Sequence, residues 1–195
     1  GKDWAVSTNS DLYSYNITNG ATSNLTAGMM GYDKNPKFSP DGKKLAWTSM
    51  PRDGYESDVN QLWIMDISSG FKSTLEGHKE YIIDFSWTDD NKIYYSFDIE
   101  ATKQIAVSTL KSFEEGNVSH TDKVITSGDF NYGHFEVADK SLIAQRQDMN
   151  HANEIFSLDK NGTPKAITHV NDNIYGELKM GKIEKRWIKT TDGAD

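Results

Sequence analysis

The chain has 195 residues, a formal net charge of −8 and no cysteine. This length suffices for one large domain, and the negative charge argues against a nucleic-acid backbone as partner. Without cysteine the chain forms no disulfide or thiol-based site, and it has no apolar run of the roughly 18 residues that a membrane-spanning helix needs.

The first predicted element lies at 11–20, where DLYSYNITNG alternates apolar or aromatic with polar residues before a turn glycine. The same order returns in QLWIMDISSG at 61–70 and in EIFSLDKNG at 154–162. Alternation with a period of two, followed by a turn, is typical of short β-strands. The chain therefore repeats one strand-and-turn unit.

A second kind of element lies at 35–49, where NPKFSPDGKKLAWTS predicts strand, tight turn, strand. Pro40 presets φ for a turn, Asp41 can accept a hydrogen bond from its own backbone, and Gly42 tolerates positive φ. The residues on either side of this turn are strand formers. We therefore expect a hairpin centred on residues 40–42.

Equivalent positions recur at steps of about 42 to 50 residues. Three series show the period: Phe38, Phe85 and Phe135; Leu12, Leu62, Ile105 and Ile155; Leu25, Leu75, Ile125 and Ile167. Repeats of this length with four short strands each are typical of β-propellers. The helical alternative is disfavoured, because no long window keeps a period of 3.6 without interruption by Gly, Pro or Asn.

The sequence thus predicts an all-β fold, a β-propeller of about four blades, each a four-stranded antiparallel sheet. The blades are expected at 1–26 (incomplete, without its inner strands), 28–77, 78–128 and 129–171. Most propellers have more blades, so we expect the chain to be part of a larger propeller. Residues 172–195 break the repeat and are predicted to form an exit strand or linker that stops at a hairpin turn.

The stretch PKFSPDGKKLAW…QLWIMDISSG resembles the propeller repeat of the Tol-system periplasmic propeller and of the prolyl-oligopeptidase superfamily of serine peptidases. MPRDGYESDVNQLWIMD at 50–66 is more specific and resembles a segment of the dipeptidyl and acylaminoacyl peptidases. KRWIKTTDG, near the end, resembles the strand by which those peptidases enter their α/β-hydrolase domain. The resemblance implies a propeller that precedes a hydrolase domain with a serine nucleophile, His as base and a backbone oxyanion hole.

None of the 15 glycines frames the G-x-S-x-G elbow on which such hydrolases present their serine. We therefore expect no catalytic residue in this chain and a role in binding or gating. The expected partners are a peptide substrate and the α/β-hydrolase domain of the same polypeptide, with no nucleic acid and no membrane span.

In an antiparallel propeller, the loops between second and third strands share one face with the loops between blades. A carboxylate on that face could hold a peptide's ammonium through charge-assisted hydrogen bonds of about 1.5–3 kcal/mol each. Arg52, Glu56 and Asp58 are the candidates for substrate binding, since alternation along an extended loop would put them on one side. The competing interpretation is structural: Arg52 pairs with Glu56 or Asp58 and rigidifies the loop.

No cofactor and no metal site are expected, because none of the five histidines has metal-ligand spacing with another. A second hypothesis is a non-catalytic Tol-type scaffold that binds proteins or glycans, and a third is a free-standing four-bladed lectin-like domain. The first residues, Gly1-Lys2-Asp3-Trp4, lack the apolar core of a signal peptide. We expect that a signal was removed or that a longer protein precedes them, and we expect export to a bacterial periplasm.

Overall fold

A computed structural model describes residues 7–75, 81–89, 91–138 and 141–193. Within these ranges it is built of short strands and one single-turn helix, α1 (Asp172–Tyr175). The strands are β1 (Tyr13–Tyr15), β2 (Thr22–Asn24), β3 (Lys34–Phe38), β4 (Lys44–Ser49), β5 (Gln61–Asp66), β6 (Lys72–Thr74), β7 (Ile82–Asp89), β8 (Lys92–Ile99), β9 (Thr102–Glu114), β10 (Asn117–Val124), β11 (Asn131–Ala138), β12 (Ser141–Gln147), β13 (Glu154–Leu158) and β14 (Pro164–Ala166).

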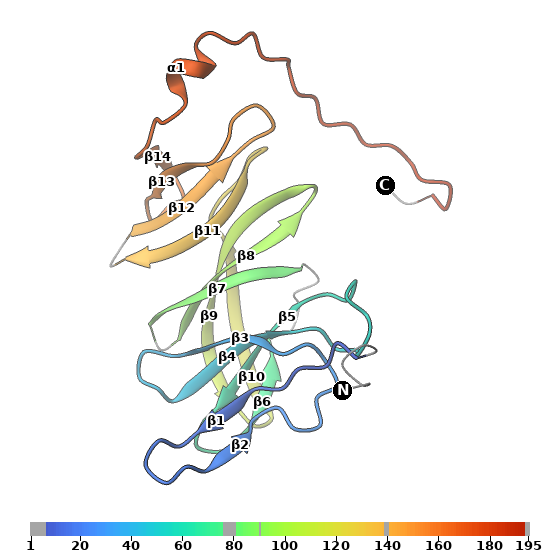
Figure 1. Cartoon of the computed structure of the whole chain (residues 1–195), viewed down its shortest axis with the longest axis vertical. Helices are drawn as coiled ribbons and strands as arrows, with labels where there is room; N and C mark the ends of the chain where they lie inside the picture. Colours follow the sequence, from blue (N-terminus) through green and yellow to red (C-terminus); the bar gives the residue numbers. More distant parts are fainter. Residues whose placement is uncertain (1–6, 76–80, 90, 139–140, 194–195) are drawn as a thin grey trace.

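The strands form four antiparallel groups that follow one another in chain order along the long axis of the molecule (Figure 1). β1 and β2 form a two-stranded hairpin, and β3 to β6 form a four-stranded meander. β7 to β10 and β11 to β14 form two more meanders, and a single parallel bridge between Asn131 of β11 and Lys103 of β9 joins them. The boundary predicted between residues 77 and 78 lies outside the described residues.

Each group closes with the same backbone hydrogen bond. The amides of Leu25, Leu75, Ile125 and Ile167 donate to the carbonyls of Leu12, Leu62, Ile105 and Ile155, at 2.8, 3.2, 2.8 and 2.8 Å. These are two of the three residue series whose spacing defined the repeat in the sequence. In three groups the next residue is a threonine, and its hydroxyl accepts a hydrogen bond from the amide of the residue whose carbonyl takes part in this closing bond. These threonines are Thr26, Thr126 and Thr168.

The recurring turn of the sequence also has one geometry. Asn16, Asp66 and Asp159 each accept backbone N–H groups two to four residues ahead, at 2.8–3.2 Å. Such bonds fix a turn locally without help from the rest of the fold. The Ser68 hydroxyl and the Ser69 amide hold the pKa of Asp66 at about 2, so the carboxylate form closes this turn.

The hairpin predicted at residues 40–42 is present between β3 and β4. The Gly42 amide donates to the Ser39 carbonyl at 2.9 Å, and Gly42 takes φ +70°. The Asp41 carboxylate accepts the Lys43 amide at 3.0 Å. The sequence Ser-Pro-Asp-Gly therefore encodes a self-contained turn between two strands.

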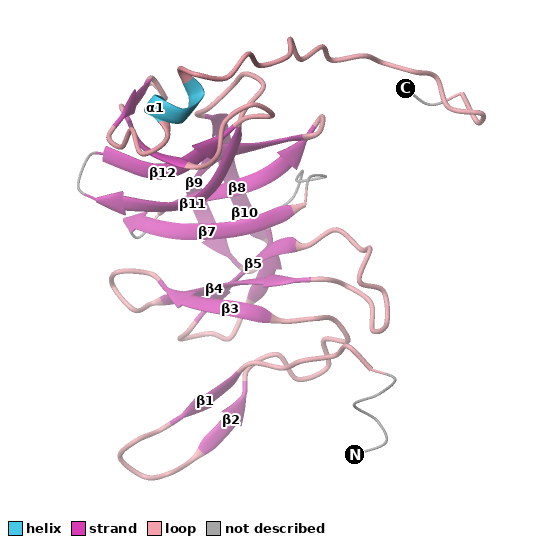
Figure 2. Ribbon diagram, turned by 45° about the horizontal axis from the view of Figure 1, so that its top comes forward, coloured by secondary structure: helices cyan, strands magenta, loops and turns pink. Residues whose placement is uncertain are grey.

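The core lies between successive sheets, which Figure 2 shows stacked face to face. One cluster joins Ala46, Leu62 and Ile64 of the β3–β6 sheet to Phe85 and Ile93 of the next sheet. A second cluster joins that sheet to the last one, and a third packs the first hairpin on the β3–β6 sheet. Each sheet is therefore stabilised by its neighbours as well as by its own ladder.

Residues 172–195, predicted to form an exit strand or linker, contain no strand in their described part. After α1, residues 176–190 run along the molecule without pairing as a strand (Figure 1). A strand requires a neighbouring backbone edge, and the tail finds none among the described residues. Two contacts hold it instead: Asn150 Nδ2 donates to the Gly181 carbonyl at 2.9 Å, and Lys185 forms an ion pair with Glu100.

Candidate functional site

Arg52 and Asp58 form an ion pair within the β4–β5 loop. The guanidinium Nε lies 3.0 and 2.9 Å from the two carboxylate oxygens of Asp58, and Nη2 also contacts Oδ1. These hydrogen bonds hold the pKa of Asp58 below its ordinary value and raise the pKa of Arg52. Asp58 is buried, and Tyr55 packs its ring 4.0 Å from the guanidinium carbon. In this structure both carboxylate oxygens of Asp58 are engaged by Arg52.

Glu56 does not join this pair. It is exposed, and no hydrogen bond or ion pair connects it to the described residues. The alternation predicted for an extended loop is wrong, because residues 51–57 form consecutive turns and Gly54 has φ +76°. A turn removes the period of two that would have aligned the three side chains. Glu56 is therefore the candidate in this loop whose carboxylate is free to meet a ligand.

Asp53 fastens the same loop to the start of the described chain, a contact that sequence reasoning missed. Its carboxylate accepts the amides of Thr8 and Asn9 at 2.7 and 3.0 Å and the Ser7 hydroxyl at 2.9 Å. The Ser7 hydroxyl and the Thr8 amide hold the pKa of Asp53 below its ordinary value. In return, the Thr8 hydroxyl accepts the Gly54 amide at 2.8 Å.

A second group of loop residues lies at the far end of the same face. A cleft of about 560 Å³ is lined by the β8–β9 turn, the β12–β13 loop, residues 129–131 and tail residues 181–185. Glu100 and Ala101 in the β8–β9 turn have φ +47° and +60°, a left-handed conformation that costs about 1–2 kcal/mol per residue outside glycine. The Arg52–Asp58 loop is not among the residues that line this cleft.

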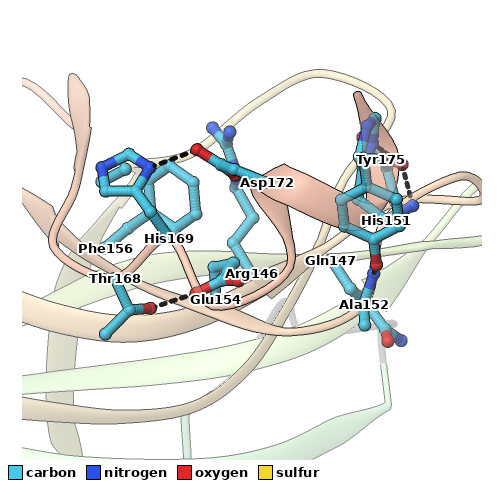
Figure 3. A pocket seen from close by; sticks show the side chains of 12 residues that line it. Arg146, Gln147, His151, Ala152, Glu154, Phe156, Thr168, His169, Asp172 and Tyr175 are labelled. Atoms are coloured by element: carbon cyan, nitrogen blue, oxygen red, sulfur yellow. Dashed lines mark hydrogen bonds and ion pairs between the residues drawn. The ribbon is translucent and has the colours of Figure 1, made fainter. Parts of the chain in front are cut away.

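Next to this cleft, a pocket of about 340 Å³ lies between the β12–β13 loop and the segment that follows β14 (Figure 3). Arg146 enters it from the end of β12, and Phe156 and Tyr175 form part of its wall. Glu154 accepts the Thr168 hydroxyl and the amides of Val170 and Asn171, the amides at 2.8 and 3.2 Å. The Thr168 hydroxyl, and after it the two amides, lower the pKa of Glu154. No role for Arg146 was predicted from the sequence.

Among the described residues, no group of three or more His, Asp or Glu side chains is arranged to hold a metal ion. None of the described helices is long and apolar enough to cross a membrane. The described site is thus a set of polar loops around two cavities, with charged groups that can bind a ligand.

No protein-family model matches the chain, but curated proteins are similar to it. Dipeptidyl-peptidase 5 of Porphyromonas gingivalis is 40% identical over 198 residues, covering 100% of this chain and 28% of the relative. Dipeptidyl-peptidase 5 of Porphyromonas endodontalis is 41% identical, covering 99% of this chain and 27% of the relative. Over its whole length the chain is similar to these dipeptidyl-peptidases. It spans little more than a quarter of the length of these relatives.

Solved structures confirm the predicted propeller fold. Acylaminoacyl peptidase of Pyrococcus horikoshii superposes with a TM-score of 0.64 at 20% identity, over 87% of this chain and 24% of that one. A TolB-type protein of Agrobacterium tumefaciens gives 0.58 at 17% identity, over 81% of this chain and 56% of that one. At such identities the likeness concerns the fold alone, which this chain shares with both proteins.

Proposed function

We propose that this chain is the non-catalytic propeller portion of a serine exopeptidase of the dipeptidyl aminopeptidase type. In this role it caps the active site, admits short or unfolded peptides, and helps to anchor the amino terminus of the substrate. The observation that carries the proposal is the 40% identity to a dipeptidyl-peptidase over the whole chain. The cavities between the loops of one face supply the polar surface that such a cap needs.

The catalytic groups of the proposed enzyme belong to an α/β-hydrolase domain elsewhere in the same polypeptide. Reading the parent gene tests this directly: it should encode G-x-S-x-G, then Asp and His, within a typical hydrolase-domain length. The full-length protein should release dipeptides from peptides with a free amino terminus. Measurable turnover by the isolated 195-residue chain would contradict the proposal, since no such elbow exists in it.

Glu56 is the proposed contributor to the amino-terminal anchor, because its carboxylate is exposed and unpaired in the described loop. In the full-length enzyme, Glu56→Ala should lower kcat/KM for peptides with a free amino terminus by roughly ten- to a hundredfold, the loss of one charge-assisted hydrogen bond. Peptides with an acetylated amino terminus should lose nothing further. Steady-state kinetics with the two substrate sets measures the difference.

Glu115→Ala is the matched control for Glu56→Ala. Glu115 is an exposed glutamate in the β9–β10 turn, away from the cavities described above. Its replacement should leave kcat/KM unchanged for both substrate sets. If Glu56→Ala behaves like Glu115→Ala, Glu56 has no part in the anchor, and the role passes to another group.

A non-catalytic scaffold of the Tol type is the alternative function, favoured by the TM-score of 0.58 to the TolB-type protein. The higher identity to the dipeptidyl-peptidases makes it the second choice. A parent gene that encodes further blades or a stop in place of a hydrolase domain would support the scaffold.

We further propose that the protein is exported, and that a bacterial periplasm is its compartment. The absence of cysteine is compatible with this address. Cell fractionation of a bacterium that carries the parent gene would test it, with recovery in the cytoplasmic fraction as the contrary result.

A further inference from the structure

Arg146 is held between two aromatic rings. Its guanidinium carbon lies 4.1 Å from the ring centre of Phe130 and 3.8 Å from that of Phe156. The sheet register explains the arrangement, since Arg146 pairs with Tyr132 on one neighbouring strand and with Glu154 on the other. Each phenylalanine is two residues along from these partners and reaches Arg146 diagonally. The rings immobilise a planar group whose N–H donors point along its edge.

The donors of this guanidinium are not used within the described chain. No carboxylate or carbonyl of the described residues accepts a hydrogen bond from the Arg146 guanidinium, and none forms an ion pair with it. Arg146 is only partly exposed, so it cannot be fully solvated either. A half-buried guanidinium whose N–H groups have no acceptor is unfavourable, unless a ligand or another part of the protein supplies one.

The carboxylates around Arg146 already have other partners. Glu154 holds the Thr168 hydroxyl and two backbone amides. Asp172 lies 2.9 Å from His169 Nδ1 (Figure 3), and Asp148 lies 2.8 Å from His151 Nδ1. Burial alone would raise the pKa of Asp148, but bonds from the Asn150 amide and the His151 ring outweigh it and lower that pKa. These acids are therefore engaged elsewhere and leave the guanidinium free.

The pocket of about 340 Å³ beside Arg146 has room for a small group. The rings of His151 and Tyr175 pack edge to face in one wall of it, with their centres 4.8 Å apart. The Tyr175 hydroxyl accepts the Ala152 amide at 2.7 Å, which joins α1 to the β12–β13 loop. The pocket thus has an ordered wall of rings around one cationic group.

We propose that Arg146 anchors a carboxylate-binding site in this pocket. A carboxylate is planar and matches the edge of a guanidinium through two parallel hydrogen bonds. It also carries a single charge, whereas a phosphate would bring nearly two negative charges beside Asp148, Glu154 and Asp172. Assigning this carboxylate to a peptide, as an acidic side chain or a carboxyl terminus, rests on the proposed function. Carboxylate binding itself does not.

Paired peptide substrates test the site in the full-length protein. One pair differs by a glutamate or glutamine side chain, and a second by a free or amidated carboxyl terminus. Arg146→Gln should lower kcat/KM for the carboxylate member of one pair by roughly ten- to a hundredfold, and leave its neutral partner within about twofold. The affected pair identifies the source of the carboxylate.

Arg146→Lys separates the contribution of the positive charge to carboxylate recognition from that of the planar guanidinium. It keeps the positive charge but loses the planar fork, so it should recover only part of the discrimination. Thermal unfolding of both variants controls for folding. Equal losses for the charged and neutral members of both pairs would show that Arg146 only supports the sheet, and would overturn the site.

A binding measurement keeps the test separate from peptidase activity. Titration of the full-length protein with N-acetylglycine, which carries a single carboxylate, should give saturable heat in a calorimeter that Arg146→Gln abolishes. If the protein hydrolyses no peptide but shows this binding, the proposed function fails and the site stands. Tighter binding of inorganic phosphate than of N-acetylglycine, or no binding of either, would overturn the proposal.

Discussion

The Arg52–Asp58 pair joins an exposed cation to a sheltered anion. The Arg52 side chain is 59% exposed and the Asp58 side chain only 7%. Most of the desolvation therefore falls on the carboxylate, which depends on Arg52 for its hydrogen bonds. Removing one partner should lower the free energy of unfolding more than the loss of a surface ion pair does, because the buried side chain at position 58 no longer receives matching hydrogen bonds from Arg52.

The first stability prediction concerns Asp58→Asn. At pH 7 it should lower the urea midpoint of unfolding, since the amide cannot satisfy the Arg52 guanidinium as the carboxylate does. The folded pKa of Asp58 is depressed by Arg52, so its stabilisation is present above the unfolded pKa of about 3.9 and is lost as pH falls through the folded pKa. The gap between native protein and variant should therefore close below pH 4.

Asp98→Asn is the comparison for that experiment. Asp98 pairs with Lys103 at 3.0 Å, but both side chains are about half exposed. Surface pairs of this kind contribute about 0–1 kcal/mol, so this variant should change the urea midpoint little at any pH. Equal midpoints for the two variants would mean that the Arg52–Asp58 pair is no more than a surface contact.

At the scale of the element, tight turns hold the sheets against one another. Gly162 in the β13–β14 turn has φ +83°, and a Cβ there would lie 1.8 Å from the carbonyl oxygen of Ile125. Ile125 follows β10 in the preceding sheet, so this glycine permits a close approach between two sheets. Gly116 in the β9–β10 turn has φ +76° but open space around it.

The variants Gly162→Ala and Gly116→Ala separate two effects: the strain of a left-handed backbone conformation and the clash of a Cβ with a neighbouring backbone. Gly116→Ala should destabilise the protein by about 1–2 kcal/mol, the cost of a left-handed conformation with a Cβ. Gly162→Ala should cost clearly more, because it adds a clash with rigid backbone to the same strain. Urea unfolding of both variants measures this. Equal losses would show that the two sheets separate easily at Ile125.

The strands and turns were predictable because their signals are local. Leu12, Leu62 and their equivalents recur at fixed spacing, and Asp66 or Asp159 closes its turn with its own backbone. The site was less predictable because it depends on three-dimensional neighbours. The turns at 51–57 break the alternation that the residue types suggested. The rings that flank Arg146 come from neighbouring strands and could be found only from the sheet register.

At the scale of the molecule, successive sheets share their cores. Phe85 of β7 is fully buried in the cluster that joins the β3–β6 and β7–β10 sheets. Lys37 on β3 reaches across the same boundary to Asp84 at 3.0 Å, and Trp87 Nε1 donates to the Lys37 carbonyl at 3.0 Å. Phe85 does not belong to the hydrophobic cluster of the last sheet, which is built around Tyr132 and Phe135.

Phe85→Ala should therefore weaken one boundary more than the rest. Truncation of a buried phenylalanine lowers the free energy of unfolding by about 3–5 kcal/mol. Because each sheet contacts mainly its neighbours, this loss should fall mostly on the two sheets that meet at Phe85. Hydrogen exchange should show the greatest loss of protection in β4, β5, β7 and β8, with a smaller loss in β12 and β13.

Ile17→Ala is the control, since Ile17 is 91% exposed. It should change stability by less than about 0.5 kcal/mol. Equal loss of protection in all sheets after Phe85→Ala would instead mean that they unfold as one cooperative unit.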